Sequence, residues 1–111
     1  MDQDRARKLL ADERTRIEEA IAALERGGPP DASEREPGDE GSQDLYQAEF
    51  NTGRRADLDN ELAALERAEE RLAAGTYGLS IESGEPIPDG RLEAVPTAER
   101  TIEEDTRYRR G

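Results

Sequence analysis

Cysteine, histidine and tryptophan are absent from these 111 residues, and only four residues are aromatic. The lack of cysteine excludes disulfides, thiolate chemistry and a thiolate zinc site, so redox conditions should not act on this chain directly. Without histidine or cysteine, the chain also lacks the usual pairs of nucleophile and base, and it has no glycine-rich phosphate loop. Surface charge accounts for its many carboxylates, and we therefore reject catalysis.

Long apolar runs are missing too. No run approaches the ~18 apolar residues that a membrane-spanning helix needs, and residues 1–25 contain no apolar segment of the kind found in signal peptides. We therefore expect a cytoplasmic location and no membrane binding. Only 32% of the residues are hydrophobic and 40% are charged. Such a composition cannot fill a large core, but it suits a coiled coil, with disorder as the alternative for the middle of the chain.

Acidic residues outnumber basic ones by 28 to 16, which gives a net charge of −12. Direct binding to nucleic acid is therefore disfavoured, and a partner with a basic groove or channel fits better. Solubility alone is the simpler explanation of this charge. Half of the net charge lies within residues 31–49, where seven acidic residues accompany one arginine.

Two helices are predicted from apolar residues at seven-residue spacing, over 2–26 and about 42–74. The stripes consist of Leu10, Ile17 and Leu24 in the first helix and Leu58, Leu62, Leu65 and Leu72 in the second. Residues 27–30, Gly-Gly-Pro-Pro, end the first helix. An antiparallel hairpin within a monomer buries both stripes; a parallel dimer is the alternative, against which the Pro/Gly break argues.

Residues 75–111 are predicted to form a small module with two short strands or extended pieces, and a last helix that begins at Pro96-Thr97 with Thr97 as the candidate cap. Its candidate core residues are Leu79, Ile81, Ile87, Leu92, Val95 and Ile102. This piece is too small to be stable alone, so we expect it to dock on the helices. The predicted domains are thus 1–74, a coiled-coil hairpin with an acidic tip at about 27–44, and 75–111.

Two short motifs within the module, Ser80-x-x-Ser83 and Thr101-x-x-Glu104, are seventeen residues apart. Two Cys-x-x-Cys knuckles at this spacing would close a tetrahedral zinc site. The surrounding residues are Ala74-Gly75-Thr76-Tyr77-Gly78, Gly84-Glu85-Pro86-Ile87 and Arg91-Leu92-Glu93-Ala94-Val95-Pro96-Thr97-Ala98. With these segments, residues 65–104 resemble the zinc-finger region of the bacterial DksA/TraR family.

All four ligand positions depart from the family's pattern, because hydroxyls are poor zinc ligands and one carboxylate cannot replace three thiolates. We predict a degenerate zinc finger without zinc or any other cofactor. Its hydroxyls are expected to hydrogen-bond turn backbone, and Glu104 to pair with Arg91 or Arg100. The alternative is that these four positions are ordinary surface residues.

The resemblance implies a transcription regulator whose coiled coil enters the secondary channel of RNA polymerase, with an acidic tip near the catalytic magnesium. The family's tip motif is replaced here, and the tip residues that we would assign are Asp39, Glu40 and Asp44. Possible contacts with the rim of the channel are assigned to Arg91, Arg107, Arg109 and Arg110. The simpler interpretation of these arginines is that they cap the C-terminus of a helix. The alternative function is a protein–protein interaction module, adaptor or dimer, that has lost polymerase binding.

Overall fold

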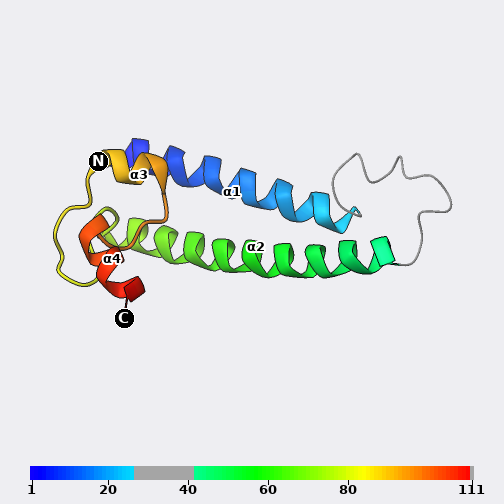
Figure 1. The fold of residues 1–111 in the computed structure, drawn as a ribbon. Coiled ribbons are helices and arrows are strands. Elements are labelled where there is room, and N and C mark those ends of the chain that lie inside the picture. Colours follow the sequence, from blue (N-terminus) through cyan, green and yellow to red (C-terminus); the bar gives the residue numbers. More distant parts are fainter. Residues whose placement is uncertain (27–41, 111) are drawn as a thin grey trace. The chain divides into compact units, whose positions relative to one another are not determined.

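The chain was analysed as a computed structural model, which describes residues 1–26 and 42–110, with side chains over 1–26 and 52–110. Four helices follow one another along these parts of the chain (Figure 1). They are α1 (Gln3–Glu25), α2 (Ser42–Ala74), α3 (Asp89–Ala94) and α4 (Ile102–Arg110). The first two confirm the predicted helices over 2–26 and 42–74. In the described ranges, no helix combines the length and the apolar character that crossing a membrane requires.

Contacts divide the chain into two compact units, and both long helices contribute to each. The unit of residues 15–62 contains the second half of α1 and most of α2. Ile17 and Leu58 are fully buried in it. Arg16 pairs with Glu61 at 3.3 Å and Glu25 with Arg55 at 3.0 Å, so residue numbers rise along one helix as they fall along the other. This register is that of an antiparallel helix pair.

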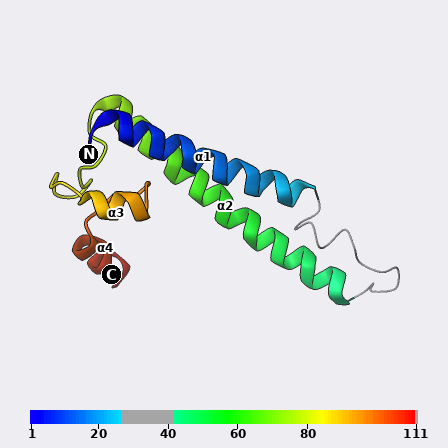
Figure 2. The ribbon, with the colours of Figure 1, turned by 90° about the horizontal axis from the view of Figure 1, so that it is seen from above.

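The other unit combines residues 1–14 with residues 63–111. Here the start of α1 lies beside the end of α2 (Figure 2). The buried apolar residues that the two helices contribute to this unit are Ala6, Leu10, Leu65 and Ala68. At its edge, Arg14 donates two hydrogen bonds to the carboxylate of Glu69, at 3.0 and 2.6 Å, which lowers the pKa of Glu69. The mainly helical fold with an antiparallel helix pair is thus confirmed.

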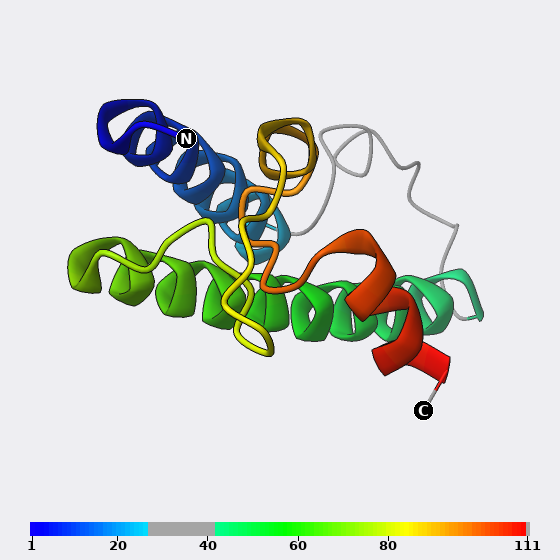
Figure 3. The same ribbon diagram turned by 90° about the vertical axis from the view of Figure 1, so that its left-hand side faces the viewer.

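The chain turns sharply where α2 ends. Gly75 and Gly78 have φ angles of +82° and +87°, which favour glycine. The carbonyl oxygen of Arg71 accepts hydrogen bonds from the N–H groups of Thr76 and Tyr77, at 2.8 and 3.1 Å, and so closes the helix C-terminus. After this turn the chain runs through a loop into α3 and then α4 (Figure 3).

Of the two alternatives expected for this region, two short strands or extended pieces, the first is wrong. A single isolated bridge joins Leu79 and Pro86 in the described part of the chain, and the second expected strand is instead the short helix α3. Ile87 and Leu92 are buried with Ala98, and Met1 and Tyr77 pack against them. The remaining four candidate core residues are exposed: Leu79, Ile81, Val95 and Ile102. So small a module has room for few buried side chains, and alternating apolar residues could not reveal which ones.

The last helix also begins later than predicted. It starts at Ile102, five residues beyond Thr97, so Thr97 does not cap it. Thr101 lies directly before the helix and occupies the capping position instead. The prediction placed the start at Pro96 because proline is common in the first turn of helices, but residues 95–101 continue as turn and extended chain.

Candidate functional site

The two motifs at zinc-knuckle spacing come together in the folded module. We call Ser80, Ser83, Thr101 and Glu104 the polar cluster. The first two lie in the turn after α2, and the last two at the start of α4. Ser80 and Glu104 are buried, with 5% and 6% of their surface exposed, so the alternative of ordinary surface residues is wrong for these two.

Thr101 and Glu104 form a reciprocal pair of hydrogen bonds. The N–H of Glu104 donates to the hydroxyl oxygen of Thr101 at 3.2 Å, and the N–H of Thr101 donates to the Glu104 carboxylate at 2.9 Å. This is a capping box, which satisfies two N–H groups that a helix N-terminus otherwise leaves unpaired. The Thr-x-x-Glu sequence is the signature of that motif. The second knuckle of the zinc finger has thus become a helix cap.

The first knuckle is organised by its own hydroxyls. The Ser80 oxygen accepts hydrogen bonds from the N–H groups of Glu82 and Ser83, at 3.1 and 3.3 Å. The Ser83 oxygen accepts one from the N–H of Glu85 at 3.2 Å. The prediction that these hydroxyls bind turn backbone is therefore confirmed. Both hydroxyls in turn donate to the carboxylate of Glu104.

Glu104 is the acceptor that joins the two knuckles. The hydrogen bonds from Ser80, Ser83 and the Thr101 N–H favour its charged form and lower its pKa from 4.5 to about 2. A buried carboxylate is stable only when such donors surround it. The ion pair predicted between Glu104 and Arg91 or Arg100 is absent from the described contacts, because these arginines pair with Asp105 and Glu82 instead.

This donor set does not fit the zinc ion that the family's finger would hold. Tetrahedral zinc in structural sites requires thiolate or imidazole ligands, whereas three of these four side chains are hydroxyls that already bond to backbone or carboxylate. Within residues 1–26 and 52–110, no group of three or more acidic residues is arranged to hold a metal ion. The polar cluster links by hydrogen bonds the same four positions that a zinc ion would link by coordination.

The four arginines predicted as rim contacts lie on α3 and α4. Arg91 is half-buried and pairs with Asp105 at 3.6 Å, and Arg109 pairs with the same carboxylate at 2.9 Å. Arg107 and Arg110 are exposed in the last turn of α4, a position that favours cations at a helix C-terminus. The structure thus places all four in one module, with two of them joined to one acid.

The predicted tip lies largely outside the described residues. This applies to Asp39 and Glu40, and to the side chain of Asp44, whose backbone belongs to the first turn of α2. The acidic tip therefore stays a prediction.

An ion-pair network that the sequence analysis missed connects the module to α2. The carboxylate of Glu99 accepts hydrogen bonds from Arg67 Nε and Nη2, at 3.2 and 3.1 Å, and from Arg71 Nη1 at 3.1 Å. Burial raises the pKa of Glu99, but the hydrogen bond from Arg67 and the charges of the arginines outweigh it and lower the pKa overall. Two arginines four residues apart on a helix were the only signal in the sequence.

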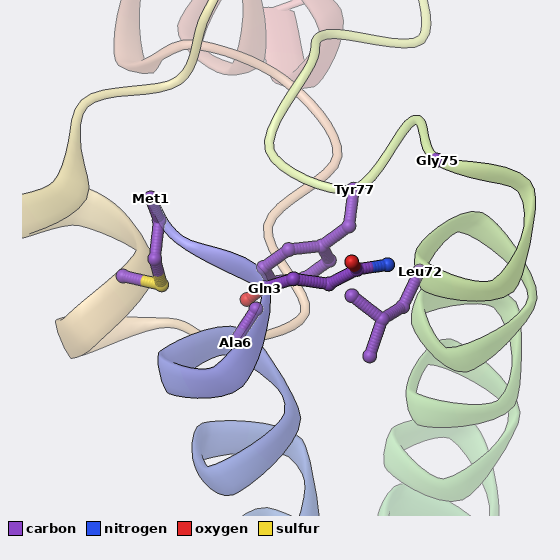
Figure 4. A pocket seen from close by; sticks show the side chains of 6 residues that line it. All are labelled: Met1, Gln3, Ala6, Leu72, Gly75 and Tyr77. Atoms are coloured by element: carbon purple, nitrogen blue, oxygen red, sulfur yellow. The ribbon is translucent and has the colours of Figure 1, made fainter.

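A small pocket of about 230 Å³ lies beside this connection, between the starts of α1 and of the module (Figure 4). Its lining residues are Met1, Gln3, Ala6, Leu72, Gly75 and Tyr77. The ring of Tyr77 lies between α1 and α2, and its hydroxyl donates to the carbonyl of Pro96 at 2.7 Å. None of the lining residues carries an acidic or basic side chain, and the polar side chains at the pocket are those of Gln3 and Tyr77.

The architecture defines a class of protein: an antiparallel helix pair whose second helix leads into a small module of the zinc-finger type. Residues 75–110 match the family described as prokaryotic dksA/traR C4-type zinc finger. The resemblance is thereby confirmed: residues 75–110 are similar to the DksA/TraR zinc finger and lack all four of its zinc-binding cysteines.

Two curated relatives are similar to part of the chain. The chain is 41% identical over 49 residues to the RNA polymerase-binding transcription factor DksA of Caulobacter vibrioides, an alignment covering 44% of this chain and 34% of the relative. It is 44% identical over 48 residues to general stress protein 16O of Bacillus subtilis, covering 42% and 29%. The chain thus spans about a third of the length of the curated relatives it matches.

A solved structure extends the similarity beyond the matched region. Transcription factor DksA2 from Pseudomonas aeruginosa has 28% sequence identity and a TM-score of 0.55, over 97% of this chain and 80% of that chain. The likeness therefore includes the two long helices as well as the module.

Proposed function

We propose that this protein regulates transcription by binding RNA polymerase. The observation that carries the proposal is the similarity to DksA2 over 97% of this chain, together with the match of residues 75–110 to the family's zinc finger. The relative from Caulobacter vibrioides is named as an RNA polymerase-binding transcription factor. A binding role also suits a chain without histidine or cysteine, and we propose no catalytic activity.

In the proposed mechanism, the paired α1 and α2 enter the secondary channel of the polymerase as a monomer. The acidic segment between the two helices approaches the active site, where Asp39, Glu40 and Asp44 act on the magnesium environment or on basic channel walls. Opposite charge on the protein and the channel speeds encounter and sets orientation. This places the site of action in the cytoplasm, with no direct contact to nucleic acid required.

The module is proposed to contact the rim of the channel. Arg107 and Arg110 are exposed at the end of α4, and they carry positive charge in a chain whose net charge is −12. They are therefore suited to acidic groups on the rim. Arg91 and Arg109, which share Asp105, would shape this surface rather than supply free charge.

The first test is binding to purified core polymerase, measured by co-elution and by fluorescence anisotropy. We expect micromolar or tighter affinity that weakens with salt, and displacement by a known secondary-channel factor. No binding at low salt would overturn the proposal and would favour an interaction module with another partner.

The tip is tested separately with Asp39→Asn/Asp44→Asn. We expect polymerase binding to change less than about threefold, because the helices and module supply most of the contact, while the effect on transcription is lost. The matched control is Asp57→Asn/Glu66→Gln, which makes the same charge change at two exposed positions of α2. An unchanged transcriptional effect in the tip variant would show that the tip carries no mechanism.

A further inference from the structure

Ion pairs attach the module to both long helices, and in the described residues Glu99 makes those with α2. Its carboxylate receives a forked pair of bonds from Arg67 and one from Arg71, as described above. Forked guanidinium–carboxylate pairs fix orientation as well as distance, because both groups are planar. Residues 67 and 71 lie on successive turns of α2, so the two guanidinium groups hold the carboxylate from one helix face.

The backbone of Glu99 makes a further connection. Its carbonyl oxygen accepts a hydrogen bond from the N–H of Ile81 at 2.9 Å. Ile81 follows Ser80 in the first knuckle, so one residue contacts both α2 and the polar cluster's turn. The Glu99 side chain is 20% exposed and that of Arg71 is 14% exposed, whereas Arg67 is half exposed. Partly buried ion pairs are less screened by solvent than surface pairs.

We propose that Glu99 is a positioning residue: held by Arg67 and Arg71, it fixes the orientation of the module on the end of α2. The module's other ion pairs to the long helices go to the start of α1, where the Met1 amino group pairs with Asp89 at 3.2 Å and Arg5 pairs with Asp89 and Glu93. Loss of the Glu99 carboxylate therefore leaves the module folded around Leu92 and the polar cluster and still paired with the start of α1, but no longer fixed to α2 by ion pairs.

A consequence for polymerase binding rests on the proposed function. A regulator that touches the polymerase with both its helix pair and its module gains affinity from holding the two surfaces at a fixed spacing. A module that is free to turn has a lower effective concentration at its contact site. Such a loss is seen mainly in the dissociation rate.

The experiment follows the angle between the module and α2 by measuring the distance between two spin labels. Because the chain has no cysteine, Glu70→Cys/Glu85→Cys introduces two unique attachment sites for spin labels, one on α2 and one on the module, both at exposed positions. We expect one narrow distance distribution in the double-cysteine background and a clearly broadened one with Glu99→Gln. Glu103→Gln, an exposed acid in the first turn of α4, is the matched control and should leave the distribution narrow.

A second variant protects the test against unfolding. Arg67→Gln removes only the half-exposed arginine and keeps the Arg71 bond, so it should broaden the distribution less than Glu99→Gln while the methyl resonances of Ile87 and Leu92 remain dispersed. A narrow distribution in Glu99→Gln with those resonances intact would overturn the proposal. So would equal broadening in Glu103→Gln.

Polymerase binding separates this inference from the proposed function. With Glu99→Gln, we expect the dissociation rate from core polymerase to rise about threefold to tenfold. If the unsubstituted protein does not bind polymerase, the proposed function fails, whereas broadening in Glu99→Gln would still support the positioning role. If the protein binds and Glu99→Gln neither broadens the distribution nor changes the dissociation rate, the positioning role alone fails.

Discussion

Ser80→Ala and Ser83→Ala make the same chemical change at two positions that would be equivalent ligands of a zinc ion. The structure predicts unequal effects. Both hydroxyls donate to Glu104, but the buried Ser80 oxygen accepts two backbone N–H groups, whereas Ser83 is exposed and its oxygen accepts one. Removing the Ser80 hydroxyl thus leaves two backbone donors without their acceptor and takes one of several donors from the buried carboxylate.

The size of the difference follows from the cost of unpaired buried groups. A hydrogen bond to a charged group contributes about 1.5–3 kcal/mol, and a buried unpaired donor costs about 1–3 kcal/mol. Because the turn can relax and regain part of these interactions, Ser80→Ala should destabilise the module by roughly 2–4 kcal/mol. At the exposed Ser83, water can replace the lost bonds, and the cost should stay below about 1 kcal/mol. Every 1.4 kcal/mol is a factor of about ten in an opening equilibrium.

Native-state amide hydrogen exchange measures the module without interference from the long helices. The N–H of Ile87 donates to the carbonyl of Gly78 at 2.7 Å, and neither serine touches this bond. Its exchange should accelerate about 30-fold to several hundred-fold in Ser80→Ala and less than about fivefold in Ser83→Ala. Equal effects, or a larger effect at Ser83, would refute the reasoning that burial of Ser80 organises the module.

Three further predictions concern the same module. Because hydrogen bonds lower the pKa of Glu104 from 4.5 to about 2, its carboxylate stabilises the module above about pH 4.5 and progressively less as the pH falls towards 2. The free energy of unfolding of the module, measured by amide exchange or NMR, should therefore fall more steeply in this window for the native chain than for Glu104→Gln. Parallel curves for the two proteins would contradict this. Leu92→Ala removes a fully buried side chain and should cost about 2–5 kcal/mol in urea titrations, against less than about 1 kcal/mol for the exposed Val95→Ala, and similar costs would place the core elsewhere. Thr101→Val abolishes the cap of α4 and should cost about 1 kcal/mol, whereas Thr106→Ala should stay within about 0.5 kcal/mol; an unchanged exchange rate in the first turn of α4 would show that the cap contributes nothing.

The long helices could be predicted from the sequence because their signals are local and repeated. Leu10 and Ile17 recur at heptad spacing, and the expected boundaries of both helices agree with the structure within a residue. The resemblance of the zinc-finger region was also readable, because the turn at Tyr77-Gly78 and the segment around Leu92 keep the family's residues. Signals of this kind depend on neighbouring residues alone.

The interior of the module could not be predicted in the same way. Ile81, Val95 and Ile102 are as apolar as Ile87 and Leu92, and only the three-dimensional path of the chain decides which two are buried. The capping box at Thr101 and Glu104 had its sequence signature, Thr-x-x-Glu, but the same four residues also occupy the position of the family's second Cys-x-x-Cys knuckle.

The same limit applied to charged residues. Glu104 is joined to Ser80 and Ser83 by the fold rather than by sequence spacing, and the two arginines that hold Glu99 come from the preceding helix. Ion pairs across such distances in sequence depend on tertiary structure, so the expected partners of Glu104 were wrong.

The central claim is that hydrogen bonds around Glu104 hold together the four positions that zinc would otherwise join. Its most direct test is the zinc content of the purified protein, combined with Ile87 amide exchange with and without a strong chelator. The account predicts no stoichiometric zinc and exchange rates that the chelator leaves unchanged. One equivalent of bound zinc, with faster exchange once the chelator removes it, would contradict the account.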